Sequence, residues 1–190
     1  SQSATGSLVF STTTTSATDI FGIHNFSVDN AVTNSNNIGG ISITNAGASG
    51  TFLVYGIRVN TSTSKTWTAT SNLIGGTVAN SIQLTATGTS SQLVGAFTNN
   101  AGATLTSNTV RNLTSNIGTG TTSNASVIGI SLTSSTLNNA VNQNTIFNLS
   151  NTNATAASVV TGIQFTGSTA GSVTRNNIYG LSVSSTSNTA

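Results

Sequence analysis

The chain contains no Cys, no Pro and no Met, and only six of its 190 residues carry a formal charge. Without Cys there is neither a disulfide framework nor a thiolate metal site, so stability must come from packing and backbone hydrogen bonds. No run approaches the roughly 18 apolar residues of a membrane-spanning helix. Four basic and two acidic residues are too few for a nucleic-acid surface, because phosphate neutralisation supplies most of that affinity.

Thr, Ser and Asn dominate the sequence in place of charged residues. The chain has 37 Thr, 30 Ser and 25 Asn, about half of its length. Such a composition often indicates disorder, but 35% of the residues are hydrophobic and fall in short regular clusters, and the Pro of flexible segments is absent. The near-absence of Lys and Glu favours an exported protein. We therefore expect a folded domain that is extracellular or on the cell surface.

An Asn followed two residues later by Ile or Val recurs along the chain. These Asn residues are Asn36, Asn72, Asn108, Asn144 and Asn176, with spacings of 36, 36, 36 and 32 residues. A fixed period of this size indicates a stack of equal units. Because equivalent residues would then lie above one another, we expect a ladder of hydrogen-bonded Asn side chains at one corner of the stack.

The residues after each repeated Asn predict a bend. Ile or Val stands two positions after the Asn, as in a buried strand. Two positions further only Gly or Asn occurs, and these residues tolerate positive φ. The predicted bend positions are Gly40, Gly76, Asn112, Asn148 and Gly180. After the bend we expect inward-facing residues at Ile41, Leu113, Leu149 and Leu181, with Thr77 as the exception in the second unit.

Two further strand patterns complete each unit. One has Gly between apolar residues, as in Ile128-Gly129-Ile130, and a weaker one precedes each repeated Asn. No sustained helical spacing of apolar residues occurs. We predict an all-β fold, a right-handed parallel β-helix of about five coils with three short strands per coil. It forms a single domain over residues 1–190, with an irregular first coil over 1–35 and a flexible tail over 184–190.

The segments NTIFNL, NNIYGL, VIGISL and VTGIQF resemble the repeats of right-handed parallel β-helix proteins with a pectate-lyase-like coil. They are most similar to the long Ser/Thr/Asn-rich repeat regions of exported bacterial surface proteins. The resemblance extends from about Leu8 to Val183 and implies the fold. It does not select a function, since the same coil occurs in lyases, hydrolases, adhesins and passive stalks.

The sequence has few residues for catalysis or metal binding. For lyases and hydrolases the resemblance implies clustered carboxylates or a calcium-and-Arg site, and glycoside hydrolysis needs two placed carboxyl groups. Only Asp19 and Asp29 are acidic, and they either lie together or stabilise turns of the first coil. A calcium site from both Asp and nearby carbonyls is an alternative. His24 is the single His, whereas zinc requires three or four ligands. We expect no catalytic residue, metal or cofactor.

Three aromatic residues, Trp67, Phe147 and Tyr179, are candidate surface contacts. Phe147 and Tyr179 share the repeat position of Arg111 and should point outward. Exposed aromatic rings stack on sugars or pack against neighbouring molecules, and packing under a loop is the alternative. Paired Thr residues precede the repeated Asn in two coils, at Thr68/Thr70 and Thr104/Thr106, and resemble an ice-binding face that the other coils interrupt.

The expected function is that of a non-enzymatic structural repeat module of an extracellular surface protein, in an adhesin, a stalk or a self-assembling filament. An open β-helix exposes strand edges at both ends. The expected partner is therefore the chain itself, end to end, or the continuation of a longer chain, with surface glycans second. A carbohydrate-binding or carbohydrate-degrading β-helix is the alternative, which aromatic residues near Asp19, Asp29 and His24 would favour. An ice-binding β-solenoid is the third hypothesis.

Overall fold

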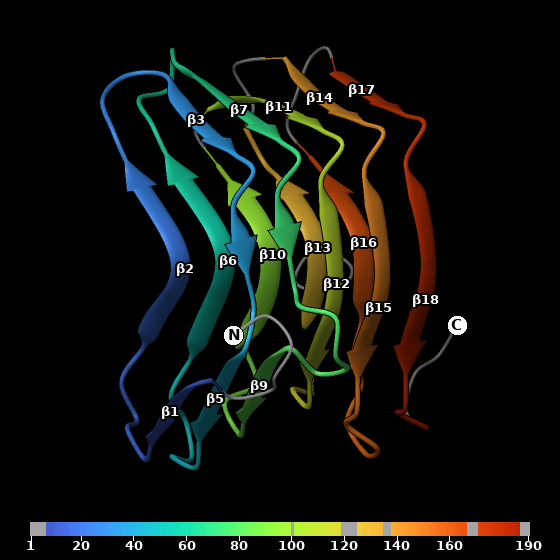
Figure 1. The fold of residues 1–190 in the computed structure, drawn as a ribbon. Helices are drawn as coiled ribbons and strands as arrows, with labels where there is room; N and C mark the ends of the chain where they lie inside the picture. Colours follow the sequence, from blue (N-terminus) through green and yellow to red (C-terminus); the bar gives the residue numbers. More distant parts are fainter. Residues whose placement is uncertain (1–6, 100, 119–124, 135–137, 167–170, 187–190) are drawn as a thin grey trace.

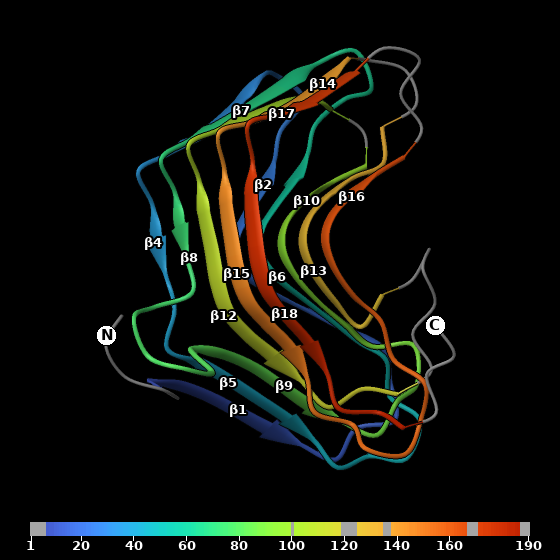
Figure 2. The same ribbon diagram turned by 90° about the vertical axis from the view of Figure 1, so that its right-hand side faces the viewer.

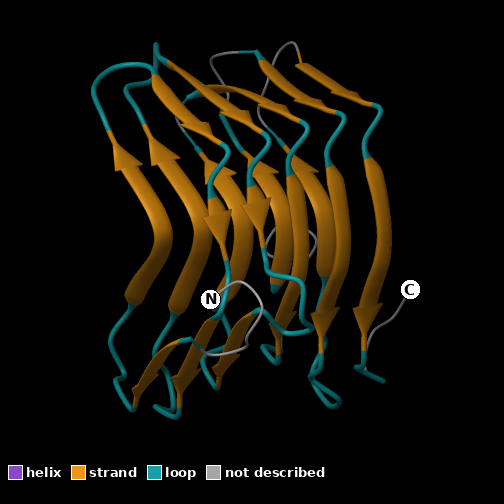
Figure 3. Cartoon of the chain, in the orientation of Figure 1, coloured by secondary structure: helices purple, strands orange, loops and turns teal. Residues whose placement is uncertain are grey.

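The computed structural model describes residues 7–99, 101–118, 125–134, 138–166 and 171–186. Within these ranges all 18 regular elements are β-strands, and they form three parallel sheets stacked as a β-solenoid of five coils (Figures 1 and 3). This confirms the predicted all-β fold with three strands per coil. The described part of the chain has no helix with the length and apolar character to cross a membrane.

Each coil contributes to all three sheets, and every strand pair is parallel. Sheet I contains β1 (Leu8–Thr12), β4 (Asn37–Ile38), β5 (Ile41–Asn45), β8 (Leu73–Ile74), β9 (Ile82–Ala86), β12 (Thr109–Ser115), β15 (Thr145–Asn151) and β18 (Asn177–Val183). Sheet II contains β2 (Thr18–Phe26), β6 (Phe52–Asn60), β10 (Gln92–Thr98), β13 (Val127–Leu132) and β16 (Val160–Phe165). Sheet III contains β3 (Ala31–Asn34), β7 (Thr66–Thr70), β11 (Gly102–Thr106), β14 (Asn139–Asn142) and β17 (Gly171–Thr174).

Viewed along the stack, the three sheets form the walls of one continuous coil (Figure 2). The chain passes from sheet II to sheet III and then to sheet I in every coil. Sheet III lies across one end of the cross-section, sheet I follows a bent side, and the strands of sheet II bow inward toward sheet I. The bow brings the backbones of sheets I and II close together.

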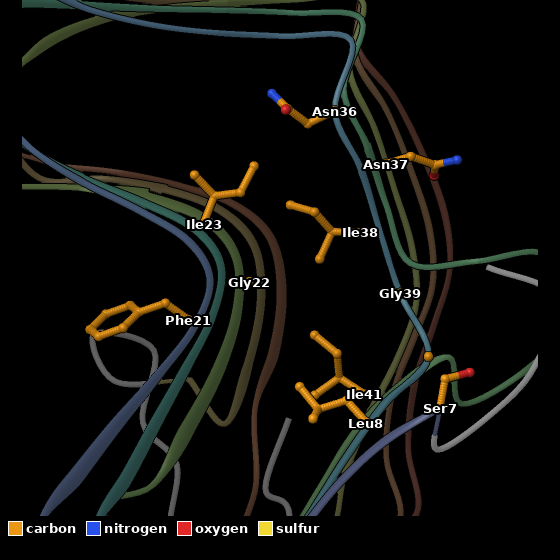
Figure 4. A pocket seen from close by; sticks show the side chains of 11 residues that line it. Ser7, Leu8, Phe21, Gly22, Ile23, Asn36, Asn37, Ile38, Gly39 and Ile41 are labelled. Atoms are coloured by element: carbon orange, nitrogen blue, oxygen red, sulfur yellow. The ribbon is translucent and has the colours of Figure 1, made fainter. Parts of the chain in front are cut away.

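A column of glycines permits this close approach. The column consists of Gly22, Gly56, Gly95, Gly129 and Gly162. A Cβ on Gly129 would lie 2.7 Å from Ile146 Cγ2 and 2.5 Å from the carbonyl oxygen of Gly162. Both distances are far below an ordinary contact, so only Gly fits. Figure 4 shows the same approach in the first coil, where Gly22 lies opposite Ile38.

Columns of aliphatic side chains fill the space between the sheets. The column in sheet I consists of Leu8, Ile41, Ile82, Leu113, Leu149 and Leu181. Its central members, Leu113 and Leu149, are fully buried. Each such side chain contributes about 1.5–3 kcal/mol when removed from water. Thr77, the expected exception, is exposed, and Ile82 occupies the inward-facing position in the second coil.

The two ends of the chain continue the same pattern as far as they are described. In the first coil, over which the sequence predicts irregular structure, β1, β2 and β3 pair in register with β5, β6 and β7. Residues 1–6 lie outside the described ranges. Of the predicted tail, residues 184–186 are described, and the N–H of Ser184 donates to the carbonyl of Asn151 at 2.9 Å. Residues 187–190 lie outside the described residues.

Replacement of Gly129 by Ala is expected to lower the free energy of unfolding by about 2–3 kcal/mol, because the methyl group must displace both Ile146 and a backbone oxygen. The matched control is Gly162→Ala. Its methyl group would meet only the side chain of Ile178, on the last described coil, so a smaller loss is expected. Urea unfolding followed by Trp67 fluorescence measures both values. A Gly129→Ala protein as stable as the wild type would contradict the close approach of the sheets.

Candidate functional site

The five repeated Asn residues form a hydrogen-bonded ladder through the solenoid. Each Oδ1 accepts from the Nδ2 group of the Asn one coil earlier, at 3.0, 2.8, 2.9 and 2.9 Å from Asn36 to Asn176. The backbone N–H of the earlier Asn donates to the same oxygen, as from Asn72 to Asn108 at 3.0 Å. Asn72, Asn108 and Asn144 are buried. The ladder therefore runs inside the protein and crosses all five coils.

The buried amides have no hydrogen-bonding capacity left for a ligand. Asn108 Nδ2 donates to Asn144 Oδ1 at 2.9 Å and to the carbonyl of Ala69 at 3.0 Å. Its Oδ1 accepts both bonds from Asn72. A side-chain amide has two N–H donors and two acceptor lone pairs, and all four are used here. Each amide stabilises the stack and has no free group for binding.

The residue before each repeated Asn has an unusual backbone conformation that the sequence did not reveal. These residues are Ser35, Ser71, Ser107, Gln143 and Arg175, with φ of 55°, 55°, 57°, 55° and 55°. Positive φ is uncommon outside Gly, Asn and Asp. Backbone bonds between coils hold it, since Ser35 N–H donates to the carbonyl of Thr70 at 2.9 Å. Ser, Gln and Arg share no preference for positive φ. The residue types at these positions therefore do not predict the conformation.

The predicted bend is present in four coils and misplaced in one. Gly40, Asn112, Asn148 and Gly180 have φ of 70°, 54°, 54° and 65°. The prediction at Gly76 is wrong, because positive φ occurs instead at Gly75 (90°) and Asn80 (56°). The second coil has a longer connection between β8 and β9, over residues 75–81. Within it the N–H of Gly76 donates to Ser81 Oγ at 2.6 Å.

Trp67 is not a surface contact, contrary to the expectation. Its side chain faces the interior from β7 and is 0% exposed. The indole N–H donates to Thr33 Oγ1 at 2.8 Å, which satisfies its one polar group. The residues paired with Trp67 in the neighbouring coils are Ala31 and Ala103, and these small side chains leave room for the indole.

The other two candidate contacts, Phe147 and Tyr179, form an outward-facing ring stack on sheet I. Their ring centroids lie 4.9 Å apart and their planes differ by 6°. The guanidinium carbon of Arg111 lies 5.8 Å from the centroid of Phe147, which places a cation at the other face of that ring. Phe147 is half-buried, whereas Tyr179 is 47% exposed. We call Arg111, Phe147 and Tyr179 the ring stack.

A shallow polar groove of about 200 Å³ accompanies the ring stack. Amide and hydroxyl side chains line it, and they include Asn80, Asn112, Thr114, Asn148, Ser150 and Ser182. Asn112 and Asn148 directly follow Arg111 and Phe147 in sequence, so the groove lies along the bends beside the stack. Asn148 Nδ2 donates to Asn112 Oδ1 at 3.2 Å, which fixes both amides. The surface thus combines aromatic faces with neutral hydrogen-bonding groups.

A second aromatic cluster surrounds Arg58 on the outer face of sheet II. Its guanidinium carbon lies 4.9 Å from the ring centroid of Tyr55. The centroids of Phe21 and Phe97 lie 5.5 and 5.6 Å from the same carbon. Arg58 Nη1 also lies 2.6 Å from Asp19 Oδ2. The cluster joins three coils and uses residues that are far apart in sequence.

Beside Arg58, Tyr55 is buried whereas His24 is exposed. Burial raises the pKa of Tyr55 above its ordinary value of 10.0, while the Arg58 charge opposes that shift and the Asp19 charge adds to it. The Tyr55 hydroxyl therefore stays protonated at neutral pH. His24 faces outward, as strand alternation predicts, and stacks on Phe21 with ring centroids 4.2 Å apart.

The two acidic residues have different partners. Asp19 pairs with Arg58, and Asp29 Oδ1 lies 3.5 Å from Lys65 Nζ. Among the residues that the structure describes, no group of three or more His, Cys, Asp or Glu side chains lies close enough to hold a metal ion. Each carboxylate thus has a cationic partner of its own.

The Thr pairs lie on the outer face of sheet III. Thr68 and Thr70 pair in register with Thr104 and Thr106, so two neighbouring coils carry aligned hydroxyl and methyl groups. The coils on either side present other residues at these positions. They are Val32, Asn34, Ala140 and Asn142. The regular array is therefore two coils deep.

Comparison of the chain with protein-family models, with curated proteins and with solved structures finds no match in any of the three. The class of the protein is defined by its fold, a parallel β-solenoid. Its function must be inferred from the geometry of its own ladder, surfaces and ends.

Replacement of Asn108 by Ala is expected to lower the free energy of unfolding by about 3 kcal/mol, because Asn72 and the carbonyl of Ala69 lose buried hydrogen-bond partners. The matched control is Asn37→Ala. Asn37 is exposed and points away from the core (Figure 4), so a change within about 0.5 kcal/mol is expected. Urea midpoints of the two variants test this. Equal midpoints would contradict a stabilising role for the ladder.

Proposed function

We propose that the chain is a non-enzymatic structural repeat module of an extracellular surface protein, of the exported bacterial kind that its repeats resemble. It would serve in an adhesin, a stalk or a filament. The buried Asn ladder carries the proposal, because it crosses five coils and uses its hydrogen bonds within the protein. Its physical effect is to hold successive coils in register.

The arrangement supports a mechanical role. Each coil pairs with the next through strands in all three sheets. For example, β10 pairs with β13, β11 with β14 and β12 with β15. Separating two coils requires the loss of all these backbone bonds and of one step of the ladder. Local opening, which exposes a chain to proteases, then costs much of the total stability. A stiff and protease-resistant rod follows.

Composition supports an extracellular location for this rod. The absence of Cys makes its stability independent of the redox conditions around it. Only four Lys and Arg residues offer sites to trypsin-like proteases, and Arg58 among them is engaged by three aromatic rings. A neutral Ser, Thr and Asn surface also remains hydrated without strong salt dependence, since few charges are available for screening.

Antibodies raised against the purified chain are expected to label the surface of intact, unpermeabilised cells of the producing organism. The reason is that a structural surface module must be accessible from outside. Immunofluorescence with and without permeabilisation measures this, and a cytosolic protein serves as the negative control. Labelling that appears only after permeabilisation would overturn the extracellular assignment.

Carbohydrate binding is a second candidate function, and the ring stack with its polar groove favours it. Aromatic faces pack against the apolar faces of sugar rings, while amides and hydroxyls bind sugar hydroxyl groups. Tyr179 offers an exposed ring, and Asn112 and Asn148 line the neighbouring groove. The cluster of Asp19, Phe21 and His24 adds a second set of aromatic and polar groups.

For this second function, the purified chain is expected to bind glycans on an oligosaccharide array. Phe147→Ala should weaken that binding at least about tenfold, because the contact between the aromatic ring and the sugar is lost. Thr104→Ala, an exposed substitution on sheet III, should leave affinity unchanged. Titration calorimetry with the bound glycans measures both constants. A chain that binds no glycan, or equal affinity of the two variants, would exclude the ring stack as a sugar site.

A further inference from the structure

The second coil differs from the other four at the bend in sheet I. Eight positions separate Ile74 from Ile82, whereas three separate the equivalent residues Val110 and Leu113 in the third coil. The additional residues lie in the connection over residues 75–81, between β8 and β9. This connection projects outward from sheet I in Figure 2 and lies in front of that sheet in Figure 1. It is therefore an added wall on an otherwise regular surface.

Hydrogen bonds fix this connection against the third coil. The carbonyl of Gly76 accepts from Asn112 Nδ2 at 2.7 Å, and the N–H of Gly76 donates to Ser81 Oγ at 2.6 Å. Ser81 is fully buried. Near the other end of the connection, Asn80 Oδ1 accepts from Thr114 Oγ1 at 2.7 Å. The wall is thus formed in advance, and little conformational entropy is lost when a molecule binds against it.

The connection and the outer side of sheet I enclose the polar groove described above. Asn80 lines it from the connection, Thr114 from the third coil, and Asn148 and Ser150 from the fourth. Its volume of about 200 Å³ lies below the roughly 300 Å³ at which ordinary small-molecule pockets begin, so it has room for one ring-sized group. None of the described residues that line the groove is charged.

Unlike the buried Asn ladder, the groove has hydrogen-bonding groups that are not used within the protein. Asn80 is exposed, and within the described part of the chain its Nδ2 has no partner. Asn148 is exposed and donates from Nδ2 to Asn112, which leaves its Oδ1 without a partner among the described residues. Thr114 uses its one hydroxyl proton on Asn80, so Ser150 donates in the 2.9 Å bond between the two hydroxyls. A free donor and free acceptors therefore line one groove, and a sugar hydroxyl both donates and accepts.

The groove is less suited to a peptide or to a phosphate group. Strands β12 and β15 are paired on both sides, so neither offers a free backbone edge to an added peptide strand. No Lys or Arg is among the described residues lining the groove that could neutralise a phosphate. Phe147 directly precedes Asn148 in the chain and places an aromatic side chain beside the groove. Neutral hydrogen-bonding groups next to an aromatic ring favour an uncharged sugar.

We infer that the groove binds one uncharged sugar residue, with the connection over residues 75–81 as its wall. Asn80 Nδ2 and Asn148 Oδ1 are the groups that bind the sugar hydroxyls. The inference rests on the second candidate function, carbohydrate binding, and adds to it the size and charge of the sugar and the residues that select it. Because only the second of the five bends in sheet I has this longer connection, the site occurs once in the described part of the chain.

NMR titration of the isotope-labelled 190-residue chain tests the site. The probes are the methyl glycosides of glucose, galactose, mannose and N-acetylglucosamine, with methyl glucuronide as the acidic comparison. At least one neutral glycoside should shift the backbone amide signals of residues 79–80, 112–114 and 148–150. It should bind at least about fivefold more tightly than methyl glucuronide, because a carboxylate has no cationic partner in the groove.

Asn80→Gly and Asn148→Gly should each weaken this binding at least about threefold, since each removes one hydrogen bond to the sugar. Gly accepts the positive φ of 56° and 54° at these positions. The matched control is Thr77→Ala, an exposed substitution in the same connection but outside the groove lining, which should bind as the wild type does. Circular dichroism and Trp67 fluorescence verify folding of every variant.

Four results would each overturn the inference. They are no shift with any neutral glycoside, shifts confined to other residues, methyl glucuronide bound as tightly as the neutral sugars, or wild-type affinity of Asn80→Gly. If the array shows glycan binding that Phe147→Ala weakens while the groove signals stay unmoved, carbohydrate binding is retained and the groove site is lost. Surface labelling of cells tests the structural role independently of both.

Discussion

The five repeated Asn side chains are satisfied in this solenoid because an Asn occupies the same position in each neighbouring coil. Asn72, Asn108 and Asn144 are buried, and their donors and acceptors are satisfied through this alignment. A shift of one residue between coils would leave polar groups unpaired in the core and would exchange inward and outward side chains. The ladder thus sets the register on which the other columns depend.

That register explains both the interior and the surfaces. Inside, it places the Gly column of sheet II against the Ile and Val column of sheet I, so the two backbones approach closely. Outside, it aligns Arg111, Phe147 and Tyr179 into the ring stack and gathers three aromatic rings around Arg58. At the ends, the same columns terminate as exposed apolar faces. In the proposed function the inner columns would provide stiffness and the outer columns would provide contacts.

Much of this arrangement could be predicted because repetition converts sequence spacing into spatial stacking. The period of the Asn residues, the Ile and Val column and four of the five bend positions were readable in this way. Trp67 was misjudged because an isolated aromatic residue has no repeated partners to show which face it occupies. Gly76 was misjudged because the connection over residues 75–81 interrupts the period in one coil. The backbone of Ser35 and its equivalents was missed because packing between coils, and not residue type, determines it.

The sequence by itself determined the period, the all-β class and the identity of the residues that form each column. Only the tertiary structure decided which contacts arise between columns. The inward bow of sheet II, the pairing of Asp19 with Arg58 and the burial of Trp67 between Ala31 and Ala103 belong to this second group. The physical reason is that a strand pattern specifies which side chains face inward or outward along one strand. It contains no distance between opposite walls of a coil, which depends on how all the side chains pack together.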